Sequence, residues 1–157
     1  VSGDSASYVR SELKMPVITG QIEEIDIEDN SMDIITMWHA LEHTPDPREH
    51  LKKAWNWLKP DGFLVVDVPN HEGTDAKETW NSWNGWDLPY HLYHFTPKTL
   101  INMLSQHGFK TCRTKDYHSQ YIKERFGRIP IINLFARIIA KCYSGQSFAV
   151  VAKKETK

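Results

Sequence analysis

Residues 30–47, which read NSMDIITMWHALEHTPDP, decide the fold of this chain. Asn30 and Ser31 form a polar turn, and the run Met32–Trp38 that follows is mostly apolar and rich in residues compatible with strands. Such a run is typical of a strand buried on both faces of a parallel sheet. Pro47 then suits the first turn of a helix. Residues 30–47 therefore predict a strand, a short loop and a helix, as in an α/β fold.

Strand and helix patterns alternate through most of the remaining sequence. The expected elements are a helix at Ser5–Leu13, a strand at Val17–Thr19, the strand Met32–Trp38, a helix from Asp46 to Leu58, a strand at Phe63–Val68, a helix from Thr96 to Gly108, a strand at Phe109–Asp116, a helix at Ile131–Cys142 and a strand at Ser147–Ala152. Alternation of this kind predicts an α/β sheet with helices on both faces.

The composition sets limits on the class of protein. A chain of 157 residues suits a single domain, and a net charge of -1 gives no reason to expect nucleic acid as a partner. Cys112 and Cys142 have neither the spacing of a metal site nor the density of a secreted disulfide scaffold, which favours a cytoplasmic location. No apolar run is long enough to span a bilayer.

Three stretches, taken in order, resemble class I S-adenosylmethionine-dependent methyltransferases: residues 20–24, residues 30–47 and residues 58–66. Residues 88–96, LPYHLYHFT, are similar to a segment of the branch that includes quinone-biosynthesis O-methyltransferases. The resemblance implies a Rossmann-like, mostly parallel sheet whose last strand is antiparallel. It also implies S-adenosylmethionine as cofactor and methyl transfer to a small-molecule acceptor, at an oxygen atom.

Laid against the family's strand order of three, two, one, four, five, seven, six, Val17–Thr19 matches strand three. The single domain expected for residues 1–157 then lacks the first βαβ unit, and no G-x-G motif occurs in the sequence. We therefore expect the sheet to be incomplete in its N-terminal half, and the chain not to hold the cofactor unaided. The rival interpretation is an inactive fragment that serves only as a binding or dimerisation module.

Losing strands one and two would leave residues 32–37 as an open sheet edge. An apolar strand with unpaired backbone groups is a template for association. We expect this edge either to pair with Val17–Thr19 or to form a homodimer with a second copy.

The resemblance places the adenine side of the cofactor on residues that follow the third strand and end the fourth, namely Gly20, Gln21 and Ile22 and then Met37, Trp38 and His39. An adenine ring needs flat apolar cover and a polar partner for its exocyclic amine, which these residue types supply. The alternative is that Ile22 and Met37 are core residues and that Gln21 lies on the surface.

Residues 39–43, HALEH, also fit H-x-x-E-H, a zinc protease motif that needs a sustained helix. A strand runs directly into His39 and two prolines follow, so at most one helical turn fits. Some quinone O-methyltransferases resemble this segment with E-x-x-E-H and a divalent ion, but His39 departs from that pattern, and we predict no metal. His43 is a candidate catalytic residue, and the alternative is that Glu42 and His43 form a buried pair that fixes the loop.

Residues 80–95 are unusually rich in aromatic side chains and either form a lid or line a ligand site. His91 and His94 lie in this segment and are candidate catalytic bases, because an attacking hydroxyl must lose its proton. The alternative is that they hydrogen-bond to backbone groups within the aromatic cluster.

Residues 129–142 place isoleucines and a phenylalanine on one helical side, with Arg128, Arg137 and Lys141 around them. Core packing or cover for the acceptor is one interpretation. The other is a weak contact with a membrane surface, since basic residues flank an apolar face.

Overall fold

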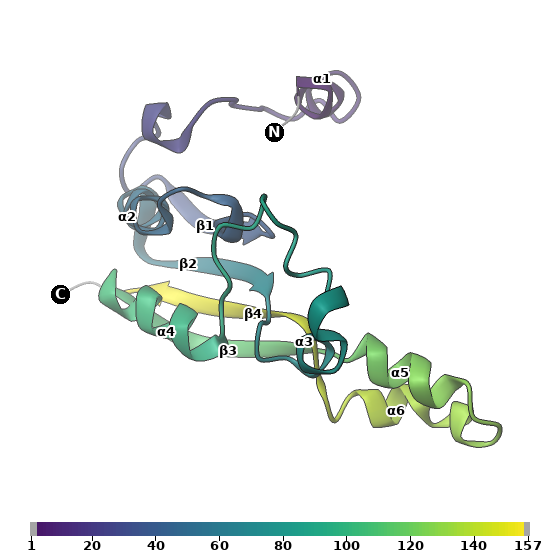
Figure 1. The fold of residues 1–157 in the computed structure, drawn as a ribbon. Helices are drawn as coiled ribbons and strands as arrows, with labels where there is room; N and C mark the ends of the chain where they lie inside the picture. The colour runs from purple at the N-terminus through teal and green to yellow at the C-terminus, as the bar shows by residue number, and fades with distance from the viewer. Residues whose placement is uncertain (1–2, 156–157) are drawn as a thin grey trace.

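The computed structural model describes residues 3–155, which are built on a four-stranded sheet (Figure 1). The strands are β1 (Met32–Trp38), β2 (Leu58–Pro69), β3 (Phe109–His118) and β4 (Ser144–Lys154), in the order β1-β2-β4-β3. β1 and β2 are parallel, and β4 runs antiparallel to both of its neighbours. This arrangement confirms the predicted α/β fold and its antiparallel last strand.

One face of the sheet carries the hydrophobic core. Leu64 and Val66 of β2 and Val150 of β4 are fully buried there, together with Leu51 of α2 (Pro47–Trp57) and Leu104 of α4 (Pro97–Gln106). Burying each such side chain contributes about 1.5–3 kcal/mol relative to leaving it exposed. These contacts fix the two helices against the sheet and so fix the ends of β1 and β2.

Both core helices begin as their sequences predict. The Asp46 carboxylate accepts hydrogen bonds from the amides of Arg48 and Glu49 at the start of α2. Thr96 and Thr99 form a reciprocal capping box at the start of α4. Each cap satisfies amides that have no partner within the helix, and each is worth about 1 kcal/mol.

The remaining helical elements are short. They are the α-helices α1 (Gly3–Ser11), α3 (Thr74–Thr79), α5 (Gln120–Gly127) and α6 (Ala136–Ala140) and the 3₁₀ turns η1 (Ile22–Glu24), η2 (Leu41–His43), η3 (Trp80–Ser82) and η4 (Ile132–Leu134). In Figure 1, α1 stands apart from the sheet, whereas α3, α5 and α6 gather at one end of it. Within residues 3–155, none of the helices has the length and apolarity needed to cross a membrane.

Two predicted elements differ from the structure. Val17–Thr19 is not a strand: these residues pair with no strand among residues 3–155, and β1 keeps a free edge. A strand forms only beside a hydrogen-bonding neighbour. The helix predicted at Ile131–Cys142 is reduced to α6. Ile131 has a φ of 71°, which breaks the helix before η4.

Candidate active site

The carboxyl ends of β1 and β2 meet at one edge of the sheet because the two strands are parallel. His39 follows β1, and its backbone N–H donates to the carbonyl of Asp67 in β2 at 3.0 Å. In open α/β sheets, ligands bind beyond the carboxyl ends of the strands. His39 has a φ of 44°, an uncommon conformation for a residue with a side chain. This edge of the sheet is therefore the candidate location of a ligand site.

Two buried carboxylates flank the His39 ring. His39 Nδ1 lies 3.2 Å from Glu42 Oε1, and its Nε2 lies 3.4 Å from Asp67 Oδ1. The Glu42 residue is fully buried and Asp67 is 3% exposed. Asp67 Oδ1 is within ion-pair reach of His39 but has no partner with hydrogen-bond geometry. Buried carboxylates with incomplete partners are costly for stability, which makes this cluster a candidate functional site.

Tyr117 of β3 extends the cluster. Burial raises the pKa of the Tyr117 hydroxyl above its ordinary value, and the hydrogen bond to Asp67 and the negative charge of Asp67 raise that pKa further. Tyr117 therefore keeps its proton in the neutral pH range and acts as a hydrogen-bonding group.

The H-x-x-E-H segment folds as the single turn η2, as its sequence predicts. Leu41, the first residue of η2, is fully buried in the core, and the Glu42 carbonyl accepts from the amides of Leu92 and Tyr93 at 2.8 and 3.2 Å. These bonds attach η2 to the aromatic segment. His39 and His43 consequently do not share a sustained helix, and the protease motif does not form.

A histidine cluster, made of His43 and His91, lies beside Glu42. Their ring centroids are 4.6 Å apart in an edge-on arrangement. His43 Nδ1 is 3.0 Å from the carbonyl of Tyr90, and His91 Nδ1 is 2.8 Å from the carbonyl of Gly85. Because a carbonyl only accepts, each Nδ1 donates, and in the neutral ring Nε2 then carries the lone pair.

His94 bonds a backbone carbonyl through Nε2 and not through Nδ1. Its Nε2 donates to the carbonyl of Trp86 at 3.2 Å, and its ring contacts the Trp86 ring with centroids 4.9 Å apart. The alternative raised from the sequence, that His91 and His94 bond to backbone groups, thus holds for one nitrogen of each ring. The other nitrogen of each ring keeps a lone pair for a proton or a ligand.

The aromatic segment is partly core and partly surface. Trp83 and Phe95 are 3% exposed, whereas Tyr90 is 68% exposed. The Trp83 and Trp86 rings pack edge-on with centroids 5.4 Å apart. The segment therefore anchors itself through buried rings and presents Tyr90 to solvent next to the histidine cluster.

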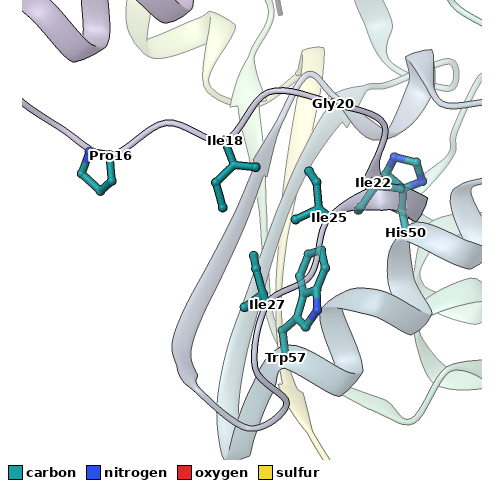
Figure 2. Close-up of a pocket in the computed structure, with 8 residues that line it drawn as sticks. All are labelled: Pro16, Ile18, Gly20, Ile22, Ile25, Ile27, His50 and Trp57. Carbon is teal, nitrogen blue, oxygen red and sulfur yellow. The ribbon is translucent and has the colours of Figure 1, made fainter.

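A second candidate region is an open hollow between the loop of residues 16–27 and α2, shown in Figure 2. Its volume is about 500 Å³. The hollow is mostly apolar, and its lining residues are Pro16, Ile18, Gly20, Ile22, Ile25, Ile27, His50 and Trp57. In Figure 2, isoleucines of the loop and the Trp57 ring of α2 surround one space, with Pro16 set apart from them.

The predicted cofactor residues lie in two separate regions of the structure. Gly20 and Ile22 line the hollow, and Gln21 between them is exposed. Met37 is half-buried against the core and Trp38 is 56% exposed at the end of β1. The lining of the hollow does not include residues 37–39.

Sequence reasoning missed Asp67, His50 and Trp57. Asp67 carried a visible signal, because it is a charged residue within the apolar run Phe63–Val68. No feature of the sequence distinguishes His50 and Trp57, since both occupy ordinary positions on an amphipathic helix.

Comparison with known proteins gives a consistent result. Residues 7–114 match the family model described as a methyltransferase domain. A protein of Mycolicibacterium smegmatis, named as a probable S-adenosylmethionine-dependent methyltransferase, is 22% identical over 108 residues, which are 68% of this chain and 40% of that protein. The matched part of the chain thus covers less than half the length of this curated relative.

Solved structures share the fold at low identity. A SAM-dependent methyltransferase from Archaeoglobus fulgidus superposes with a TM-score of 0.68 at 19% identity, covering 98% of this chain and 73% of that one. A Thermotoga maritima protein, named as a possible histamine N-methyltransferase, has a TM-score of 0.67 at 17% identity, covering 96% and 70%. At these identities the likeness concerns the fold alone.

Proposed function

Because the chain belongs to the methyltransferase domain family, we propose that it forms part of an S-adenosylmethionine-dependent methyltransferase that modifies a small-molecule acceptor at oxygen. The observation that carries the proposal is the polar site beyond the carboxyl ends of β1 and β2, where Glu42, Asp67 and the histidine cluster converge. An inactive binding module is not favoured, because buried carboxylates with incomplete partners have no structural benefit.

The histidines suit chemistry at a hydroxyl group. An acceptor hydroxyl must release its proton as its oxygen attacks the methyl carbon, and a histidine with a free ring nitrogen can take that proton. His43, His91 and His94 each bond a backbone carbonyl through one ring nitrogen, and in the neutral ring the other nitrogen can accept a proton. We propose these three as the catalytic residues.

The residues present fit one end of the cofactor. The hollow offers the flat ring of Trp57 and the side chains of Ile18 and Ile22, which suit an adenine ring, and His50 offers a polar group. Gly20 has a φ of 153°, which favours glycine and brings the backbone to the rim without a side chain. When bound, S-adenosylmethionine supplies the methyl group as a sulfonium. We also propose Met37, Trp38 and His39, which lie at and just after the carboxyl end of β1 and outside the lining of the hollow, as contacts of the cofactor.

The ribose and methionine ends of the cofactor require residues that this chain does not contain. The sequence has no G-x-G motif, and the curated relative is much longer than the chain. We propose that a preceding βαβ unit supplies the glycine-rich loop and that the chain forms one domain with it. The segment LPYHLYHFT supports assignment to the quinone-biosynthesis branch of the family.

The experiment is a transfer assay with radiolabelled S-adenosylmethionine and the protein encoded by the whole gene. The acceptor panel contains catechols and other phenols in one arm and imidazole amines in the other, because one structural relative is named for a nitrogen acceptor. Label transfer to the phenols supports the proposal. Transfer to the amines alone would contradict the oxygen assignment, and no transfer to any acceptor would contradict the activity.

A homodimer through β1 is a further part of the proposal. β1 is an edge strand, and its Ile34 and Trp38 are 59% and 56% exposed. Val17–Thr19 does not pair with this edge, and in the whole protein strand one of the proposed βαβ unit would cover it. The dimer is therefore proposed for the 157-residue chain alone, in which a second copy can pair with the backbone groups of β1. Sedimentation velocity should show a dimer that Thr36→Pro converts to a monomer, and a monomeric wild type would contradict it.

A weak membrane-surface contact of residues 129–142 is also proposed. Ile131, Leu134 and Ile138 are 78%, 76% and 63% exposed, so the core-packing interpretation of this side is wrong for these three residues. Arg128 and Arg137 accompany them and suit anionic headgroups. Co-sedimentation with vesicles containing phosphatidylserine should be lost in Ile131→Ser/Leu134→Ser, and equal binding to neutral vesicles would contradict the basic component.

A further inference from the structure

A small polar pocket lies between α3, η3 and α5, at the same edge of the sheet as the candidate active site. Its volume is about 220 Å³, which is below the roughly 300–1,000 Å³ of pockets for drug-sized ligands. Gln146 of β4 lines the pocket, and its carbonyl accepts from the amide of Asn70, the residue after the carboxyl end of β2. The pocket therefore lies where ligands of open α/β sheets bind, and its size suits one small ring.

Trp83 contributes a buried indole N–H that has no acceptor. The residue lines the pocket and is buried, and its Nε1 has no hydrogen-bond partner. A buried tryptophan N–H usually has a partner, because an unpaired buried donor is costly for stability. The Trp83 N–H is therefore a candidate donor to an oxygen atom of a ligand.

Side-chain amides are the second polar feature of the pocket. Asn84, Gln120 and Gln146 line it, and within residues 3–155 their side chains make no hydrogen bond. The hydroxyl of Tyr121, another lining residue, is likewise without a partner in that range. Each amide offers two N–H donors and one carbonyl acceptor, and the hydroxyl both donates and accepts. The pocket thus presents donors and acceptors together.

Asp75 holds one side of the pocket in place. Its carboxylate accepts from the hydroxyl of Ser119 and from the backbone amides of Gln120 and Tyr121, so its lone pairs are engaged by the start of α5. The hydroxyl of Thr79 donates to the Asp75 carbonyl at 2.7 Å and keeps oxygen lone pairs. These bonds fix the backbone from which Gln120 and Tyr121 extend.

The charge of the pocket opposes an anionic ligand. Among the described residues that line it, none is a lysine, an arginine or a histidine, and the two charged members are Asp75 and Glu124. A phosphate or carboxylate would meet like charge there and no cation. Glu124 is exposed, so its charge is screened by solvent and does little to favour an amine. A neutral ligand fits this lining best.

We infer that this pocket is a subsite for a neutral, hydroxyl-rich group of the acceptor, such as a sugar ring. Each sugar hydroxyl donates and accepts, so one ring can bond the Trp83 N–H and the amides together. Contiguous rings join the pocket to the candidate base: Trp83 packs on Trp86 with centroids 5.4 Å apart, and Trp86 contacts His94 at 4.9 Å. The assignment of this group to the acceptor rests on the proposed function, whereas binding by the pocket does not.

The first test observes the indole N–H of Trp83 by heteronuclear NMR in the protein encoded by the whole gene. Trp83→Phe identifies its resonance. The neutral probes are D-glucose, D-galactose and myo-inositol, and the charged probes are D-glucosamine and D-gluconate. We expect at least one neutral probe to shift the Trp83 resonance saturably and the charged probes to bind more weakly. Binding by none of the neutral probes, or equal or tighter binding of a charged one, would overturn the inference.

The indole N–H of Trp55 is the internal control. Its Nε1 is also buried without a partner, but Trp55 lies against Gly108 and outside this pocket, so its resonance should not move. Gln120→Ala, at an exposed position, should weaken binding of the sugar by about 10-fold through lost hydrogen bonds. Gln106→Ala, at the exposed end of α4, should leave the affinity unchanged. Equal affinities of the two variants would contradict the placement of the ligand.

The assignment to the acceptor has its own test. Arbutin carries a glucose ring and a free phenolic hydroxyl, whereas hydroquinone has the phenol without the sugar. In the transfer assay, kcat/KM for arbutin should exceed that for hydroquinone by about 10-fold, and Gln120→Ala should remove most of that difference. Transfer to arbutin no faster than to hydroquinone would overturn the assignment. Because the NMR titration involves no methyl transfer, its failure would leave the methyltransferase proposal standing, and a failed transfer assay would leave the binding result standing.

Discussion

The candidate active site and the hollow beside α2 differ in how well the chain packs them. The region beyond β1 and β2, with η2 and the aromatic segment, contains buried groups such as Glu42 and His91 that are tied to backbone partners. The loop of residues 16–27 lines an open hollow over α2, and its Ile18 is 61% exposed. Contacts within the described chain therefore hold the first region more firmly than the second.

The largest expected difference between the two regions is in how much a truncated side chain lowers the free energy of unfolding. Leu41→Ala removes a fully buried core side chain beside η2 and should lower the free energy of unfolding by about 2–5 kcal/mol. Ile18→Ala on the loop should change it by less than about 0.5 kcal/mol, since the side chain is mostly exposed. Urea denaturation of both variants measures the contrast, and equal losses would show that the loop is as well packed as η2.

The buried hydrogen bonds between Asp75 of α3 and the start of α5 should contribute less to the unfolding free energy than Leu41 does. Asp75 accepts from the hydroxyl of Ser119 and from the amides of Gln120 and Tyr121, which fixes the start of α5 behind the aromatic segment. Asp75→Asn replaces acceptor lone pairs with donors and should cost about 1–3 kcal/mol in urea denaturation. Asp87→Asn, an exposed change in the same part of the chain, serves as the control, and a loss of equal size there would contradict the account.

Hydrogen exchange sharpens the same comparison without a mutation. The amide of Leu92 donates to the Glu42 carbonyl at 2.8 Å, so it should exchange on the order of 100-fold more slowly than the amides of Ile18 and Thr19 in the loop. Amide-resolved exchange by NMR gives the ratio. Equal rates would mean that the aromatic segment is not fastened to η2.

The smallest expected effect is on the pH dependence of the unfolding free energy, through Tyr117 and its neighbour Asp67. The raised pKa of Tyr117 means that its contribution to stability is complete below its unfolded pKa, near 10, and is lost as the pH rises through the folded value. Between pH 9 and 11, the wild type should therefore lose more unfolding free energy than Tyr117→Phe. Parallel curves for the two proteins would show that burial and Asp67 do not act on this hydroxyl.

The sequence was sufficient for the sheet and for the core helices because their signals are local. The apolar runs at Met32–Trp38 and Phe63–Val68 and the caps at Asp46 and Thr96 each form the element that their residues favour. The strand at Val17–Thr19 failed because pairing depends on a neighbour and not on the three residues themselves. Helix α5 went unpredicted, since its N-cap residue, Ser119, is itself held by Asp75, which is distant in sequence.

The candidate site was predictable only in part. The motif at residues 39–43 directed attention to His43, and the density of aromatic residues directed it to His91 and His94. The sequence does not show that these residues lie close together. Their proximity depends on the hydrogen bonds from the amides of Leu92 and Tyr93 to the Glu42 carbonyl, beside the unpartnered Oε2 of Glu42. Hydrogen-bond partners that are remote in sequence leave no periodic pattern.

The proposed function requires that this chain hold the residues that contact the acceptor and only the adenine side of the cofactor site. Isothermal titration of S-adenosylhomocysteine, the product of methyl transfer, into the 157-residue chain and into the protein encoded by the whole gene tests it most directly. The account predicts micromolar binding by the longer protein and no measurable heat from the chain alone. Equal micromolar binding by both would contradict it, because the hollow beside Trp57 would then suffice for the cofactor.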